Sequence, residues 1–298
     1  MKTHTAWENP ELRTAYLARQ LNRNAMGLVL GAGISKGFGL PEWDELLDSM
    51  YKGHEQHRPK GKSAQIQADH FRRVVCEGNQ QKYLDCVSSA LYENYNADLD
   101  QLQKNATLGS IAALVMSSAR GHASSVITFN FDDILERYLE YHGFVVESVP
   151  DVPRWSSSAD VEVFHPHGLL PAPGSNRRKK SKEIVFSRTE FIEALTENDD
   201  PKRHQLLVAM RSRTCLFLGV SGNDDHQLAL MKIVKESHAA NSTKTLYWGV
   251  WISADQMALE AKDEWKKQGI FPLGIKNWDE LPKQLYQIAQ QAARQRGE

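Results

Sequence analysis

Two short segments of the sequence place glycines at the end of an apolar run. The first is GAGIS at residues 31–35, directly after the run Leu28–Leu30. Glycines in such a turn let the backbone approach a diphosphate, and the N–H groups of the turn can point at it, although a plain tight turn has the same signature. The second is FLGVSGNDD at residues 217–225, which suits another part of the same ligand or a turn with a helix cap.

Two further segments carry side chains that could act on a bound substrate. TFNFDD at residues 128–133 lies where an expected strand gives way to an expected helix. Asn130 can orient a sugar hydroxyl, a carboxamide or a water, unless the Asn or an Asp of this segment only caps the helix. HPHG at residues 165–168 places a histidine at a strand end, where it either accepts a proton or has a structural role. A metal pair is disfavoured, because no HExxH motif or cysteine cluster accompanies these histidines.

Hydride transfer is disfavoured by the surroundings of the first glycine turn. Dinucleotide motifs of dehydrogenases open a helix directly and have an acid at the end of the following strand. Here the turn continues as KGFGLPEWDELL, and the acids about twenty residues on lie in an expected helix with Pro41 in its first turn.

The elements that must position these groups alternate between strands and helices. Apolar or β-branched runs predict strands near residues 26–30, 124–129, 144–149, 161–164, 215–220, 246–251 and 270–275. Helical spacing predicts helices between them, including one after the capping box of Ser187 and Glu190. The pattern predicts an α/β fold with a Rossmann-like, doubly wound, mainly parallel sheet in a single domain over 1–298. Ligands of such sheets bind beyond the carboxyl ends of the strands.

A long stretch without strand signals separates the first two strands. Residues 51–122 show helical spacing in three places, and we interpret them as a helical insert. A helix is also expected before the first strand, with Asn9 as its cap. The basic run SNRRKKSK at 175–182 is expected to be a solvated turn between short strands.

Composition excludes several classes of protein. The 298 residues include 36 basic and 37 acidic ones, so a protein whose main task is to bind nucleic acid directly is not expected. Three cysteines cannot form a disulfide framework and suit a reducing compartment. The first residues lack an apolar signal core, and apolar runs are far below the roughly 20 residues that cross a bilayer. We therefore expect a cytoplasmic protein that is not bound to a membrane.

The order of GAGIS, TFNFDD, HPHG and FLGVS resembles the sirtuin superfamily from about Gly27 to the C-terminal helix, without the insert. The resemblance implies NAD+ binding by the first turn, contacts with the nicotinamide ribose from the second segment, a catalytic histidine, and a late loop at the adenosine half. The residues implied are Gly31, Ala32, Gly33 and Ser35 for the first turn, Asn130 and Asp132 for the ribose, His167 as the catalytic histidine, and Gly219 and Ser221 for the late loop.

Departures from protein-deacylating sirtuins point to a narrower group. Those enzymes have two CxxC pairs that bind zinc after the histidine, and this chain has no cysteine in that interval. Its GLPEWDELL, IVFSRTEF and FLGVS segments resemble bacterial sirtuin-like NADases of anti-phage defence. The resemblance implies an NAD+ glycohydrolase with Asn130 and His167 as catalytic residues, NAD+ as substrate, no required cofactor and no zinc. The alternatives are an NAD-dependent protein deacylase and a non-catalytic NAD-sensing subunit.

Such an activity must be regulated, and we expect assembly of the chain with itself or with another protein to regulate it. An unregulated NADase would kill its host, and no separate sensor domain is evident. The resemblance implies a homo-oligomer, with a HerA-type ATPase as a possible partner. The helical segments 1–24 and 51–122 would supply the contact surfaces, unless they pack against the sheet.

Overall fold

The computed structural model describes most of the chain. The described residues are 7–151, 158–175, 181–196, 200–221, 225–241, 247–254 and 259–296.

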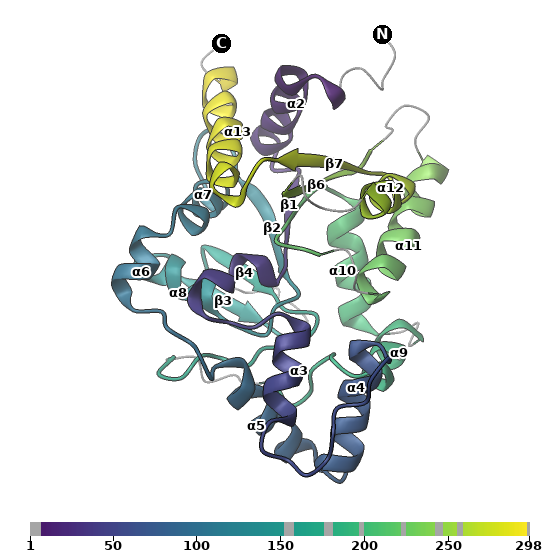
Figure 1. The fold of residues 1–298 in the computed structure, drawn as a ribbon. Coiled ribbons are helices and arrows are strands. Elements are labelled where there is room, and N and C mark those ends of the chain that lie inside the picture. The colour runs from purple at the N-terminus through teal and green to yellow at the C-terminus, as the bar shows by residue number, and fades with distance from the viewer. Residues whose placement is uncertain are drawn as a thin grey trace.

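A seven-stranded parallel sheet forms the centre of the molecule (Figure 1). Its strands are β1 (Met26–Leu30), β2 (Ala123–Thr128), β3 (Val146–Val149), β4 (Val161–Phe164), β5 (Thr214–Leu218), β6 (Gly249–Ala254) and β7 (Ile270–Ile275). The strand order is β3-β4-β2-β1-β5-β6-β7, and every pair is parallel. Strand β1 therefore lies between β2 and β5, and the carboxyl ends of these three strands meet at one edge of the sheet.

Helices connect the strands and cover the sheet. They are α2 (Pro10–Asn22), α3 (Trp43–Tyr51), α4 (Ala64–His70), α5 (Gln80–Leu91), α6 (Leu99–Lys104), α7 (Ala106–Val115), α8 (Ile134–Tyr141), α9 (Arg188–Thr196), α10 (Pro201–Arg211), α11 (Asp225–Asn241), α12 (Leu259–Lys267) and α13 (Leu281–Arg296). Short 3₁₀ segments are η1 (Ala32–Ile34), η2 (Lys36–Phe38) and η4 (Trp278–Glu280), and Phe71–Val75 (η3) is π-helical.

Alternate residues of the strands face two separate cores. Leu28 and Leu30 of β1 lie in the core that contains α2, α7 and α13. Val29 faces the opposite core, to which α10, α11 and Trp265 of α12 contribute. A central strand that is buried on both sides explains the continuous apolar run in the sequence. The structure thus confirms the predicted doubly wound α/β fold.

Some local expectations need correction. Pro41 precedes α3 instead of occupying its first turn, because Glu42 forms the cap of that helix and a capping box with Glu45. Helices α6 and α10 were not expected from the sequence. The capping box of Ser187 and Glu190 is confirmed by hydrogen bonds to the Glu190 carboxylate from the amides of Phe186 and Ser187. Of the basic run, residues 176–180 lie outside the described residues, and its described flanks are not strands.

The predicted helical insert divides into two parts. Helix α7 returns to the sheet and packs against α13, which also packs against α2. Helices α3, α4 and α5 pack mainly against one another and α9, at the bottom of Figure 1. Buried residues of α2, α4, α5 and α7 belong to the same core as Leu28 and Leu30 of β1, which supports the alternative that these segments pack on the core.

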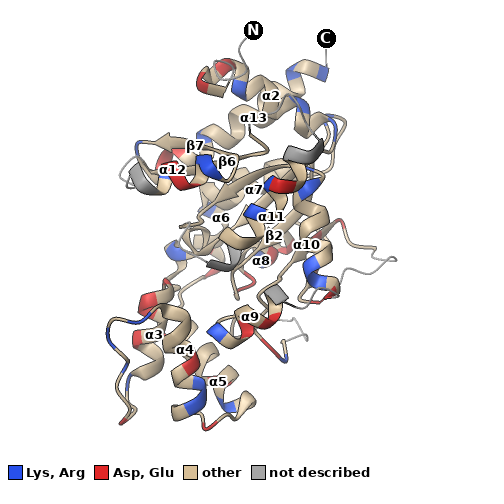
Figure 2. Ribbon diagram, turned by 90° about the vertical axis from the view of Figure 1, so that its right-hand side faces the viewer, with Lys and Arg blue, Asp and Glu red and all other residues tan. Residues whose placement is uncertain are grey.

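Figure 2 shows Lys and Arg residues interspersed with Asp and Glu residues along the described ribbon. Among the helices that the structure describes, none combines the length and the apolar character needed to span a bilayer.

Candidate functional site

The candidate site lies at the carboxyl ends of β1 and β2, which are neighbours in the sheet. Strand β1 ends at Leu30, and the chain then forms the 3₁₀ turn Ala32–Ile34. Strand β2 ends at Thr128, and residues 129–133 lead into α8. The parallel register therefore brings the GAGIS turn and the TFNFDD segment together, as the sequence predicted.

The two glycine turns pack directly against each other. A Cβ atom on Gly31 would lie 2.6 Å from the Gly219 carbonyl oxygen, and one on Gly33 would lie 2.9 Å from the Gly219 Cα. Gly219 has a φ of +67°, in the left-handed region that favours glycine. Close contact between the turns therefore accounts for the glycines without a bound phosphate.

Most amides of the GAGIS turn are engaged within the protein. The N–H groups of Gly31, Gly33, Ile34 and Ser35 donate to the carbonyls of Leu218, Gly219, Gly31 and Ala32, respectively. The Ala32 amide has no acceptor among the described residues, and Ala32 lines the pocket described below. The N–H groups of the turn were expected to point at a diphosphate. We now expect this of the Ala32 amide alone.

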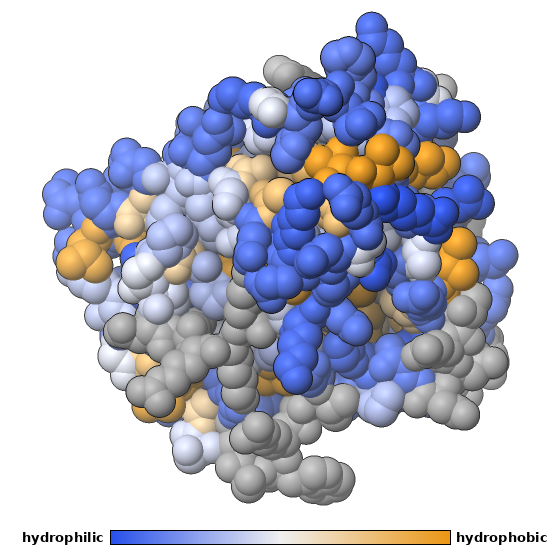
Figure 3. All heavy atoms as spheres, turned by 90° about the horizontal axis from the view of Figure 1, so that it is seen from below, coloured by the Kyte–Doolittle hydropathy of each residue, from blue (hydrophilic) through white to orange (hydrophobic). Residues whose placement is uncertain are grey.

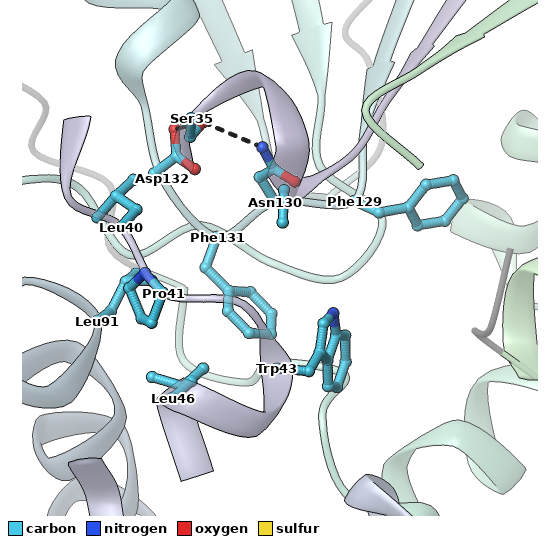
Figure 4. A pocket seen from close by; sticks show the side chains of 11 residues that line it. Ser35, Leu40, Pro41, Trp43, Leu46, Leu91, Phe129, Asn130, Phe131 and Asp132 are labelled. Atoms are coloured by element: carbon cyan, nitrogen blue, oxygen red, sulfur yellow. Dashed lines mark hydrogen bonds between the residues drawn. The ribbon is translucent and has the colours of Figure 1, made fainter. Parts of the chain in front are cut away.

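Three of the predicted polar residues form one hydrogen-bond network (Figure 4). The Asn130 Nδ2 donates to the Gly31 carbonyl and to the Ser35 Oγ, both at 3.2 Å. The Ser35 hydroxyl in turn donates to the Asp132 Oδ1 at 3.0 Å. Ser35 is buried, so it connects Asn130 to Asp132 instead of facing solvent.

The network leaves one polar atom of Asn130 available. No donor reaches its Oδ1 within the described part of the chain, and Asn130 is half-buried at the pocket wall. Asn130 does not cap α8, because the Asp132 Oδ1 accepts the Ile134 amide at 3.1 Å. The alternative that an Asn or Asp of this segment caps the helix therefore applies to Asp132 and not to Asn130, whose Oδ1 can accept a hydrogen bond from a ligand or a water.

Asp132 is buried inside this network. Burial raises its pKa to about 6, although the Ile134 amide and the Ser35 hydroxyl stabilise the carboxylate. The carboxylate is thus ionised at neutral pH but protonated in mild acid.

Aromatic and aliphatic side chains enclose the rest of the pocket, which has a volume of about 40 Å³. Phe131 and Trp43 lie below Asn130 in Figure 4. The ring centroids of Trp43 lie 6.3 Å from Phe131 and 4.7 Å from Phe186. The apolar lining residues are Leu40, Pro41, Trp43, Leu46, Leu91, Phe129 and Phe131. Sequence reasoning missed this wall, although the aromatic residues alternate with the polar ones in TFNFDD.

The two histidines of HPHG have different surroundings. His167 is fully buried, with its ring 4.7 Å from Phe129 and 5.5 Å from Phe191. It does not line the pocket, but it contacts Phe129, which does. His165 is also fully buried and contacts Glu136. The structure brings Ala32, Ser35, Asn130 and Asp132 together and places His167 behind the Phe129 ring.

Of the late loop, Gly219 contacts the GAGIS turn through its backbone, and Ser221 is exposed beyond it. Neither residue lines the pocket. The rest of this segment, residues 222–224, lies outside the described residues.

Replacing Asp132 with asparagine should remove the pH dependence of stability that burial of this carboxyl group imposes. Both hydrogen bonds to residue 132 go to Oδ1, which asparagine keeps. Because the folded-state pKa of Asp132 is raised to about 6, its contribution to stability is present in acid and is lost as pH rises through that value. Chemical denaturation at about pH 5 and about pH 7 should therefore show wild type losing stability relative to Asp132→Asn. If the difference in the free energy of unfolding between the two proteins is the same at both pH values, the prediction is wrong.

Comparison with known proteins identifies one domain. A family model described as SIR2-like domain matches residues 124–273, about half of the chain. The match includes Asn130, Asp132, His167 and the late loop, and it excludes the GAGIS turn. No curated protein matches the chain.

Proposed function

The chain belongs to the SIR2-like domain family, and from this premise we propose that it is an NAD+ glycohydrolase that releases nicotinamide and ADP-ribose. Membership of the family suggests an activity that involves NAD. The observation that carries the narrower proposal is the network of Asn130, Ser35 and Asp132. It leaves the Asn130 Oδ1, at the wall of a pocket, without a donor among the described residues. An acceptor held in this way can orient a hydroxyl group or a water molecule.

The proposed reaction transfers the ribosyl group of NAD+ to water. Nicotinamide leaves as a neutral molecule when the bond between its ring nitrogen and the ribose C1 breaks, and the ring nitrogen keeps the electron pair. The enzyme must therefore stabilise an oxocarbenium-like ribose and place water at C1. Asn130 would accept a hydrogen bond from that water or from a ribose hydroxyl through its Oδ1.

Other residues would supply a negative charge, an acceptor for a proton, and contacts with the parts of NAD+ that lie far from C1. The Asp132 carboxylate lies one hydroxyl group away from Asn130 and would stabilise the positive charge that develops on the ribose. His167, as a neutral imidazole, would accept the proton that water loses once the Phe129 ring, which separates it from the pocket, moves aside. The Ala32 amide would contact the diphosphate, while Gly219 and Ser221 would contribute to the adenosine half, so that binding of remote groups orients C1.

In a cell, this reaction would consume NAD+, which suits an effector of anti-phage defence. An assay of nicotinamide release, with and without an acetylated peptide, separates the proposed activity from the alternatives. Release from NAD+ alone supports the hydrolase. Release only with the peptide would indicate a deacylase, and binding of NAD+ without release would indicate an NAD-sensing subunit.

Activity should not depend on zinc. Among the described residues, no three His, Cys, Asp or Glu side chains are grouped so that they could hold a metal ion. Four ligands are typical of structural zinc, and the three cysteines are insufficient for a Cys₄ site. We expect chelators to leave the rate of nicotinamide release unchanged and elemental analysis to find no stoichiometric zinc. One zinc per chain would contradict this expectation.

We also propose that assembly controls the activity, through a homo-oligomer or a HerA-type ATPase partner. The contact surface would be the group of α3, α4, α5 and α9, since α2 and α7 pack on the sheet side of the molecule. Figure 3, the view from below, shows a mainly hydrophilic surface with separate hydrophobic patches. Val74 of the π-helical segment and Ile192 of α9 are exposed.

Oligomer formation can be measured by size-exclusion chromatography with light scattering at several concentrations, together with assays of NAD+ cleavage. We expect a mass above that of one chain and a rate per chain that changes with assembly. A strict monomer with full constitutive activity and no co-purifying partner would contradict the proposal.

A further inference from the structure

A buried ion pair lies directly behind Asn130. The His165 Nε2 lies 2.7 Å from the Glu136 Oε1, and the two side chains are 0% and 1% exposed. On the other side of the imidazole ring, the His165 Nδ1 lies 3.2 Å from the backbone carbonyl oxygen of Asn130. The pair therefore connects α8 and the end of β4 to the residue that the proposed reaction needs most.

The chemistry of the two contacts determines which nitrogen carries a proton. The Asn130 carbonyl can only accept a hydrogen bond, so the His165 Nδ1 must donate to it. A carboxylate and a neutral Nε2 would both present lone pairs, so a proton must also lie between the Nε2 and the Glu136 Oε1. In either position of that proton, the Nδ1–H faces Asn130.

The surroundings favour the charged form of His165. Burial lowers the pKa of His165, but the Glu136 carboxylate and the Asn130 carbonyl outweigh this effect and raise it overall. The nearby Asp132 carboxylate acts in the same direction. A charged imidazole forms a stronger hydrogen bond to a carbonyl than a neutral one.

Glu136 is itself held in place. The Ser148 hydroxyl on β3 donates to the Glu136 Oε1 at 2.7 Å, and the His165 amide donates to the Val149 carbonyl at 2.9 Å. The imidazole is therefore fixed from two strands and one helix.

Hydrogen bonds therefore hold three groups of Asn130: its backbone amide, its backbone carbonyl and its side-chain nitrogen. Its amide N–H donates to the Thr128 Oγ1, its carbonyl accepts from His165, and its Nδ2 donates to Gly31 and Ser35. The carbonyl belongs to the peptide that joins Asn130 to Phe131, so its orientation helps to set the direction of the Asn130 side chain.

We propose that the buried Glu136–His165 pair orients Asn130 for the reaction, which makes His165 a positioning residue. The inference rests on the proposed function, in which the Asn130 Oδ1 contacts the water or the ribose. His165 itself lies behind the pocket wall and does not line the pocket.

Two double variants separate orientation of Asn130 from simple stability. In Glu136→Gln/His165→Asn, the asparagine nitrogen takes the place of Nδ1 and can still donate to the Asn130 carbonyl. In Glu136→Gln/His165→Gln, the glutamine nitrogen takes the place of Nε2 and faces residue 136 instead. Both variants remove the buried charges, so each is the matched control for the other.

Kinetics of nicotinamide release should differ between the two variants. We expect kcat of the asparagine variant within about twofold of wild type, and kcat of the glutamine variant about tenfold lower with little change in KM. Their melting temperatures should be similar. Equal kcat values for the two variants would overturn the proposal.

Structure and spectroscopy test the proposal independently of activity. In crystal structures, the Asn130 Nδ2 should remain near Gly31 and Ser35 in the asparagine variant and move away in the glutamine variant. If the wild type releases no nicotinamide, the proposed function fails and these structures still decide whether His165 orients Asn130. If neither variant folds, the imidazole ¹⁵N spectrum of the wild type decides, because an unprotonated His165 Nδ1 would overturn the proposal.

Discussion

Asn130→Ala is expected to abolish NAD+ cleavage while leaving the fold intact. The substitution removes the Oδ1 that would orient water or ribose, together with the Nδ2 that connects Gly31 to Ser35. Loss of two hydrogen bonds costs about 1–3 kcal/mol, which a domain with about 5–15 kcal/mol of stability tolerates. Nicotinamide release by the purified variant, measured below its melting temperature, checks the prediction.

A matched substitution controls for the general effect of losing an asparagine. Asn105 caps α7, where its side chain accepts the Leu108 amide at 2.9 Å, and it does not line the pocket. Asn105→Ala should cost about 1 kcal/mol and retain NAD+ cleavage. A folded Asn130→Ala protein that retains nearly wild-type activity would refute the role of Asn130.

His167→Ala is expected to lower turnover by about 100-fold or more, the usual effect of losing a general base. His165→Ala should lower turnover much less, because His165 acts only through the position of Asn130. If His165→Ala has the larger effect on turnover, the catalytic histidine has been placed two residues too late in the sequence.

Folding must be controlled for in this second prediction, because His167 is fully buried between Phe129 and Phe191. His167→Gln fills more of the space and should be more stable than His167→Ala, yet equally slow. His238→Ala removes a histidine that stacks on Trp248, outside the pocket, and should retain activity. A His167→Gln variant with wild-type turnover would exclude a base at this position.

The fold was predictable because its strands carry strong local signals. The run from Leu28 to Leu30 is apolar without interruption, as expected for a parallel strand with a core on each side. Helix α10 was missed because its buried residues, such as Leu206 and Met210, form only a weak amphipathic pattern. Helix α7 is separate from the other helices of the insert because it packs against α13, a helix that is far away in the sequence.

The site was predictable only in part. Parallel neighbouring strands end at the same edge, so the convergence of Ser35 with Asn130 and Asp132 follows from the order of the motifs. The sequence contains no local signal that Gly31 and Gly33 pack against Gly219, because this contact depends on the pairing of β1 with β5. For the same reason, the wall formed by Trp43 and the contact of His165 with Glu136 became visible only in the folded chain.

The reaction of the purified 298-residue chain with NAD+ alone tests the central claim most directly. Nicotinamide and ADP-ribose should form in equal amounts, followed by proton NMR in the presence of a chelator and in the absence of any peptide. The Asn130→Ala variant should produce neither above the rate of NAD+ without protein. NAD+ that stays intact with the wild-type chain in every oligomeric form obtained, or cleavage that persists in Asn130→Ala, would contradict the account.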